Sequence, residues 1–276
     1  MPVVAVLWGL ALLTAISLSL LWSASTSYSL AHSSFEIAGT NATVEAGVNR
    51  AVAALFDPRP ERRWRVDGTP QTFEFDGVLI KISIQDELGK IDINQADQLL
   101  LANLLQAAGL DAGAASSLAD KIIDWRTAAP LKRLNGAKDQ DYRAAGSAFE
   151  PRNGAFQSVD ELRLVMGMTP VLFQKIEPAL TVYSGQPAFD AQVAPREALQ
   201  ALPGMTLQNA EATVAARSSE RLSDGSISGG LTALHGRAFT IRAAFERDRC
   251  SVLYDVTVRL TENPNQPYWV LNWEAK

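Results

Sequence analysis

Few side chains in this sequence are placed to do chemistry together. The two histidines are His32 and His235, and the single cysteine, Cys250, lies in a strand-like run with no histidine nearby. His32 follows a predicted membrane span and His235 lies in a predicted linker, so they form neither a Ser-His-Asp arrangement nor a histidine-based metal site. No glycine-rich loop of the P-loop or dinucleotide-binding type is present. We therefore predict that the protein is not an enzyme and that Cys250 fills core or surface.

Three aspartates lie in or beside a polar loop at residues 127–157: Asp124, Asp139 and Asp141. Carboxylate oxygens suit Ca²⁺, which takes about six to eight oxygen ligands. Four basic residues lie among these aspartates: Lys132, Arg133, Lys138 and Arg143. This mixture of charges favours solvated loop carboxylates, so we predict no cofactor, with calcium in the 124–143 loop as the alternative.

The N-terminal segment predicts a membrane span. Residues 2–34 contain no Asp, Glu, Lys or Arg, and residues 3–22 are mostly apolar. About 20 apolar helical residues cross a ~30 Å hydrocarbon core, whereas a secretory signal has a shorter apolar region after a basic stretch. We expect one helix from residue 2 to about residue 56, and a short basic leader that is removed on maturation or precedes the printed start. The predicted positions for membrane span and assembly are Val3, Ala5, Leu12 and Trp22.

Strand patterns flank a helical pattern in the rest of the chain. Asp-Gly pairs at 67–68 and 76–77 separate β-rich runs and predict a small antiparallel meander over residues 63–86. Alternating apolar residues return from Phe239 onward, after the linker SDGSISGG. Strands, helices and strands again suggest that the helical block is inserted into one sheet. We therefore expect the C-terminal strands to pair with the hairpin at residues 70–85.

The helical block repeats itself around single glycines. Segments 159–180 and 196–217 align so that Gly167 and Gly204 are equivalent, and a looser copy surrounds Gly109. Each glycine is expected to end a helix at positive φ, and Asn94 is expected to cap the first helix of the block.

These helix–glycine–helix units resemble helix-hairpin-helix DNA-binding modules. Each hairpin has only one glycine, however, and residues 88–235 hold 16 acidic against 13 basic residues. The net charge of the whole chain is −5, which also argues against polyanion partners. We expect the block to serve packing or protein contact, with a membrane-anchored DNA-binding or DNA-uptake protein as the alternative function.

Six motifs occur in order along nearly the whole chain: VVAVLWGLALL, GKIDIN, ADKIIDWR, NGAKDQDY, RNGAFQSVDELRLVMGMT and LPGMT. With this order and spacing, the chain resembles the K-type minor pseudopilins of the bacterial type II secretion system. The resemblance implies an α+β, pilin-like fold, with a long N-terminal transmembrane helix on an antiparallel sheet. A large helical domain, SAM-like or helix-hairpin-helix-like, is inserted between the strands. The implied parts are the helix at 1–56, the sheet at 57–87 and 236–276, and the helical domain at 88–235.

The same resemblance implies a function in the export of folded proteins across the outer membrane. The implied subunit caps or initiates the periplasmic pseudopilus at its tip, with I- and J-type pseudopilins and the inner-membrane secretion platform as partners. It crosses the bacterial inner membrane once, with its C-terminal domain in the periplasm, and takes neither nucleic acid nor a small-molecule substrate.

Two positions matter for the comparison with that family. Most pilin-like subunits carry a glutamate at the fifth mature position that pairs with a neighbour's N-terminus, and K-type subunits lack it. If Met1 is the first mature residue, Ala5 stands there. Family members also have calcium-associated carboxylates where this chain has Thr127, Ala129 and Lys138, which argues against a calcium site here.

Overall fold

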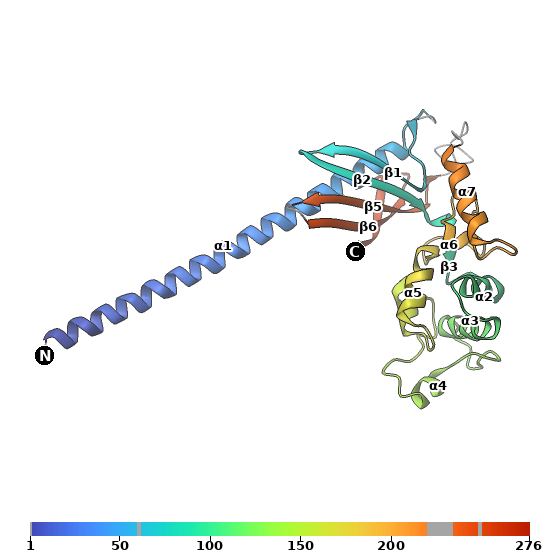
Figure 1. The fold of residues 1–276 in the computed structure, drawn as a ribbon, viewed down its shortest axis with the longest axis horizontal. Helices are drawn as coiled ribbons and strands as arrows, with labels where there is room; N and C mark the ends of the chain where they lie inside the picture. Colours follow the sequence, from blue (N-terminus) through green and yellow to red (C-terminus); the bar gives the residue numbers. More distant parts are fainter. Residues whose placement is uncertain (1, 60–61, 220–233, 248–249) are drawn as a thin grey trace. The chain divides into compact units, whose positions relative to one another are not determined.

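The computed structural model describes residues 2–59, 62–219, 234–247 and 250–276. Two units form the chain, one ending at Gly47 and the other running from Val48 to Lys276. The first lies within helix α1 (Pro2–Leu55), which is continuous over 54 residues (Figure 1). The prediction of one helix from residue 2 to about residue 56 is confirmed. No proline interrupts it before Pro58, where the missing N–H and the fixed φ no longer suit a helix.

The last two turns of α1 belong to the second unit. Val48, Val52 and Leu55 recur at helical spacing and are buried. The hydroxyl of Tyr268 donates a hydrogen bond to Asn49 Oδ1 at 2.9 Å, which ties this end of the helix to strand β7 (Tyr268–Ala275).

A five-stranded antiparallel sheet has the strand order β1-β2-β5-β6-β7. Figure 1 labels the first four of these strands. The strands before β7 are β1 (Asp67–Phe75), β2 (Val78–Asp86), β5 (Ala238–Arg247) and β6 (Cys250–Leu260). Ile82 lies opposite Ala243 and Ile84 opposite Ile241, so the predicted pairing of C-terminal strands with the hairpin is confirmed. Cys250 is exposed at the start of β6.

The hairpin is simpler than the predicted meander. Asp76 and Gly77 form its turn with φ of 50° and 73°, as a type I′ turn requires. The first Asp-Gly pair was predicted to be a loop, and this is wrong, because it lies within β1. Gly68 has φ of 83° at a shift of register with β2, so the pair marks a β-bulge and residues 64–66 form no strand.

The helical elements lie between β2 and β5 in the sequence (Figure 1). The α-helices are α2 (Gln98–Ala107), α3 (Ala112–Arg126), α4 (Asp139–Ala144), α5 (Pro170–Ile176), α6 (Arg196–Leu199) and α7 (Leu207–Ser219). Short 3₁₀ helices are η2 (Glu87–Gly89), η3 (Val159–Leu164) and η4 (Glu177–Ala179), and β3 (Ile91–Asp92) pairs in parallel with β4 (Leu180–Thr181). This block and the sheet form one compact unit, so the division at residues 88–235 stays a prediction. The SDGSISGG linker lies outside the described residues.

The block has its own apolar core, in which Leu105, Ile122 and Phe173 are among the buried side chains. Gly109, Gly167 and Gly204 have φ of 111°, 95° and 75°, which confirms that each repeat turns at a glycine in the left-handed region.

The predicted cap of α2 is wrong. Asp97 caps this helix by accepting a hydrogen bond from Leu100 N at 2.8 Å. Asn94 instead bonds the backbone of Phe156, with its Oδ1 accepting from N at 2.7 Å and its Nδ2 donating to O at 2.9 Å. A long-range contact therefore uses the residue that the local pattern assigned to the helix end.

Candidate functional site

The first candidate site is the apolar half of α1. Residues Pro2–Ser19 have a mean hydropathy of 2.0, and the helix is long and apolar enough to cross a membrane. Val3, Leu12 and Trp22 are 69%, 60% and 79% exposed, and Ala5 lies in the same helix. A water-soluble helix would not present such a surface to solvent, whereas a lipid-facing helix does. The roles predicted for these four positions stay predictions.

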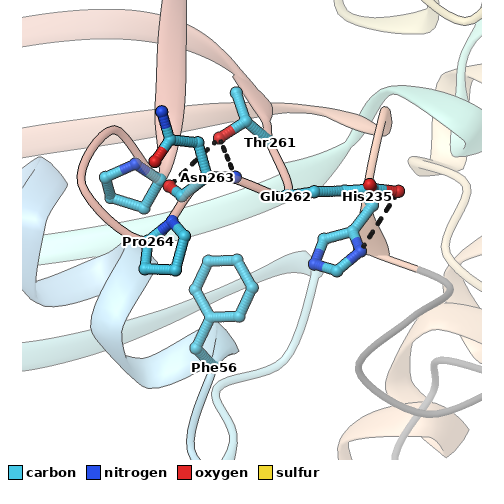
Figure 2. Close-up of a pocket in the computed structure, with 7 residues that line it drawn as sticks. Phe56, His235, Thr261, Glu262, Asn263 and Pro264 are labelled. Atoms are coloured by element: carbon cyan, nitrogen blue, oxygen red, sulfur yellow. Dashed lines mark hydrogen bonds and ion pairs between the residues drawn. The ribbon is translucent and has the colours of Figure 1, made fainter.

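His235, the predicted linker histidine, lines a pocket of about 320 Å³. Figure 2 shows the residues around this pocket. Its lining residues are Phe56, His235, Thr261, Glu262, Asn263, Pro264 and Pro267. His235 Nδ1 lies 3.9 Å from the exposed Glu262 Oε1, and the Phe56 ring lies 6.3 Å from the imidazole between centroids. Thr261 Oγ1 accepts from Asn263 N at 3.2 Å within its own loop. Thr261 Oγ1 also donates to the backbone O of Gln266, so the turn between β6 and β7 is closed by its own hydrogen bonds.

The polar loop at residues 127–157 is the second candidate site. Each of its three candidate carboxylates already has protein donors. Asp124 Oδ2 accepts from Arg133 N at 3.0 Å, and Asp139 Oδ1 accepts from Asn153 Nδ2 at 3.0 Å. Asp141 accepts from Lys132 Nζ at 2.6 Å and from Lys138 N at 2.9 Å. The three carboxylates that were predicted as alternative calcium ligands therefore bond to other residues of the same loop.

The backbone of the loop packs closely against the carboxylate of Asp124. A Cβ added at Gly136 would lie 1.8 Å from Asp124 Oδ2, so only glycine lets the loop approach the carboxylate. Burial raises the pKa of Asp124, while Arg133 and Lys138 act in the opposite direction. One turn earlier in α3, Asp120 accepts from Arg133 Nε at 2.6 Å.

The donor set of this loop does not fit a calcium ion. Ca²⁺ needs several oxygens free to turn toward it at about 2.3–2.6 Å, whereas these oxygens face N–H and ammonium donors. Within the described ranges, moreover, no three His, Cys, Asp or Glu side chains form a group that could hold a metal.

A buried ion pair lies where the helical block joins the sheet. Asp86, the last residue of β2, is fully buried and pairs with Arg237, which directly precedes β5. Asp86 Oδ1 also accepts from Leu88 N at 2.9 Å. Next to this pair, Thr240 Oγ1 donates to Glu87 Oε1 at 2.7 Å. The two crossings of the chain between sheet and block are therefore tied together, and the sequence analysis did not identify these residues.

We expect Asp86 to make stability depend on pH. Burial raises the pKa of Asp86 from 3.8 to about 6, against the opposing effect of Arg237. Between about pH 4 and about pH 6 the folded chain therefore keeps a proton on Asp86 that the unfolded chain releases. This proton stabilises the folded state by roughly 3 kcal/mol, at 1.36 kcal/mol per pKa unit, and the stabilisation is lost as the pH rises through 6. The free energy of unfolding of the wild type minus that of Asp86→Asn should therefore decrease as the pH rises from about 4 to about 7.

Chemical denaturation at a series of pH values measures this difference, and Asp57→Asn is the matched control. Hydrogen bonds from Arg59 hold the pKa of Asp57 below its ordinary value. The free energy of unfolding of the wild type minus that of Asp57→Asn should therefore increase with pH. A difference for Asp86→Asn that stays constant or rises with pH would contradict the expectation.

Comparisons of the sequence with known proteins found similarity to one family over part of the chain. Residues 81–185 match the family model described as type II secretion system (T2SS), protein K. A type II secretion system protein K from Klebsiella pneumoniae is 33% identical over 79 residues, which are 29% of this chain and 24% of that protein's length. The alignment thus spans about a quarter of the relative.

One solved structure has a similar fold. A chain in the crystal structure of the GspK-GspI-GspJ complex, from the type 2 secretion system of enterotoxigenic Escherichia coli, matches with a TM-score of 0.59 and 16% identity. The match covers 89% of this chain and 98% of that chain. This similarity and the helices and strands of the chain itself confirm the predicted α+β fold class.

Proposed function

We propose that this chain is a K-type minor pseudopilin, because residues 81–185 match the family model described as type II secretion system (T2SS), protein K. In this role it caps or initiates the periplasmic pseudopilus at its tip, and the pseudopilus serves the export of folded proteins across the outer membrane. The observation that carries the proposal is this match, which begins within β2 and extends over most of the helical block, in a chain whose first helix is apolar enough to span a membrane. The comparisons lend no support to the DNA-binding alternative.

The proposal includes partners and a location. The chain crosses the bacterial inner membrane once through α1, and its body lies in the periplasm. It binds I- and J-type minor pseudopilins and the inner-membrane secretion platform, and it acts without enzymatic activity, nucleic acid or a small-molecule substrate. Support comes from the similar chain in the GspK-GspI-GspJ complex. The edge strand β7 adds to it, because Trp269 and Trp273 are exposed at 56% and 38%, and exposed aromatic side chains are typical of contact surfaces.

Co-purification tests this function. The full-length chain, tagged at its C-terminus and extracted in mild detergent, is expected to retain the I- and J-type pseudopilins of the same organism. A second inner-membrane protein with one apolar helix, extracted and tagged in the same way, is the control for binding through detergent micelles. Failure to retain either pseudopilin, while the body remains folded, would refute the assignment to the pseudopilus tip.

We expect Ala5→Glu to impair membrane insertion or tip assembly, or at best to leave them unchanged. A carboxylate in lipid is costly unless a partner's charge satisfies it. The partner of such a glutamate would be the subunit ahead in the fibre, and a tip subunit has none. Ala5→Ser is the control for a small polar change. The measurement is the amount of variant recovered with the I and J types from membranes, and stronger recovery with the glutamate would contradict the tip position.

A further inference from the structure

The ammonium group of Lys138 is surrounded by oxygen atoms at the centre of the polar loop. Its Nζ donates to the backbone O of Asp124 at 2.6 Å, to Asn153 Oδ1 at 2.9 Å and to the backbone O of Thr127. An ammonium group has three N–H donors, so these three oxygens, which we call the Lys138 cage, use all of them.

Two of the cage oxygens are the carbonyl groups of residues at the C-terminal end of α3. The last carbonyls of a helix lack partners within the helix and carry the negative end of its dipole, so a cation is favourable there. Lys138 meets this need, and because it is also the N-cap residue of α4, it joins the two helices across the loop.

The third cage oxygen comes from a residue with an unusual backbone conformation. Asn153 has φ of 53°, a region that asparagine enters more readily than most residues. Its Oδ1 faces the ammonium group and its Nδ2 faces Asp139, so the amide links a cation to a carboxylate. The distant end of the loop is thereby held against α3.

We propose that the Lys138 ammonium is the structural cation of this loop and stands where a metal ion would otherwise be needed. Of the neighbouring carboxylates, Asp124 and Asp141 accept from Lys132 and backbone N–H groups and Asp139 accepts from the Asn153 amide, so these oxygens are already directed at protein donors. The helical block therefore keeps its loop ordered without calcium. This inference concerns the fold of the block and does not depend on the function proposed above.

Amide hydrogen exchange of residues 124–157, measured by mass spectrometry on the full chain in detergent, tests the proposal. Wild type is expected to exchange equally slowly in EGTA and in calcium up to about 1 mM, the range of weak extracellular calcium sites. Lys138→Met should exchange roughly tenfold faster or more in both conditions, since hydrogen bonds from a charged donor are worth at least that factor. Arg143→Met is the matched control, because the ion pair of Arg143 with Glu150 lies in the same loop with both side chains at least half exposed, and its loop should stay near wild type.

A third variant separates a cation site from ordinary packing. Lys138→Asp removes the ammonium group and leaves space for a Ca²⁺ ion between the new carboxylate and the three cage oxygens. Its loop should exchange fast in EGTA and slow down in calcium. Exchange of β5 and β6 reports in each variant whether the sheet remains folded.

Three results would overturn the proposal. They are faster exchange of the wild-type loop in EGTA than in calcium, a Lys138→Met loop as slow as wild type, and a Lys138→Asp loop that calcium leaves unchanged. If Lys138→Met also unfolds the sheet, the wild-type comparison and Lys138→Asp decide the matter.

Discussion

Leu12→Arg is expected to abolish stable membrane insertion of the chain. The substitution places a charge near the centre of the apolar half of α1, at a cost of roughly 2.5–3.5 kcal/mol for insertion. A factor of about a hundred in the insertion equilibrium follows from 1.4 kcal/mol per tenfold. Carbonate extraction of membranes, with a blot of pellet and supernatant, measures the effect. Export by the secretion system should fall with it.

The matched control makes the same substitution at an exposed leucine in the body. Leu134 is 94% exposed in the polar loop, so Leu134→Arg should leave insertion unchanged. Unimpaired export by a Leu12→Arg chain that is still expressed and folded would count against an anchored subunit.

Arg237→Ala is expected to destabilise the body by about 3–5 kcal/mol, the usual cost of leaving a buried charge without its partner. Asp86 is fully buried, and its pairing with Arg237 joins the end of β2 to the start of β5. Denaturant unfolding followed by tryptophan fluorescence measures the loss.

Two further variants show that the loss comes from the buried charge. Arg143→Ala removes an exposed partner of Glu150, in a pair 2.8 Å apart, and should cost at most about 1 kcal/mol. The double variant Asp86→Asn/Arg237→Ala should recover part of the stability, because its buried carboxylate is gone. A loss for Arg237→Ala no larger than that for Arg143→Ala would disprove the importance of the pair.

Features set by local periodicity could be predicted from the sequence. The apolar run and the absence of proline between Pro2 and Pro58 specify α1, and alternating apolar residues specify β2 and β5. The turn glycines of the helical block, such as Gly167, were also predictable, because positive φ excludes most other residues.

Features set by contacts between distant residues could not be predicted. Asn94 resembles a helix cap in the sequence but bonds Phe156, which lies 62 positions later. Asp67 and Gly68 resemble a hairpin turn, yet pairing with β2 makes them part of a strand. Arg237 follows Asp86 by 151 positions, so only the topology of the sheet brings this pair together.

The candidate site shows the same division. The span positions, such as Leu12, follow from hydropathy alone, because lipid acts on each residue independently of the rest of the fold. Lys138 was noted in the sequence as a basic residue among carboxylates and as a position where related proteins have a calcium-associated carboxylate. Its partners are two carbonyl groups and the amide of Asn153, and backbone oxygens leave no signal in side-chain composition.

The ion pair between Asp86 and Arg237 has a mechanical consequence. A pull on α1 from the membrane side reaches the sheet through the covalent chain, and the strands share it through their antiparallel ladders. The helical block leaves the sheet after Asp86 and returns to it at Arg237, and these two points are clamped together. Tension that passes through the Asp86–Arg237 ion pair does not pass through the residues between Asp86 and Arg237. The block can therefore keep its shape under a load on the anchor that strains the sheet.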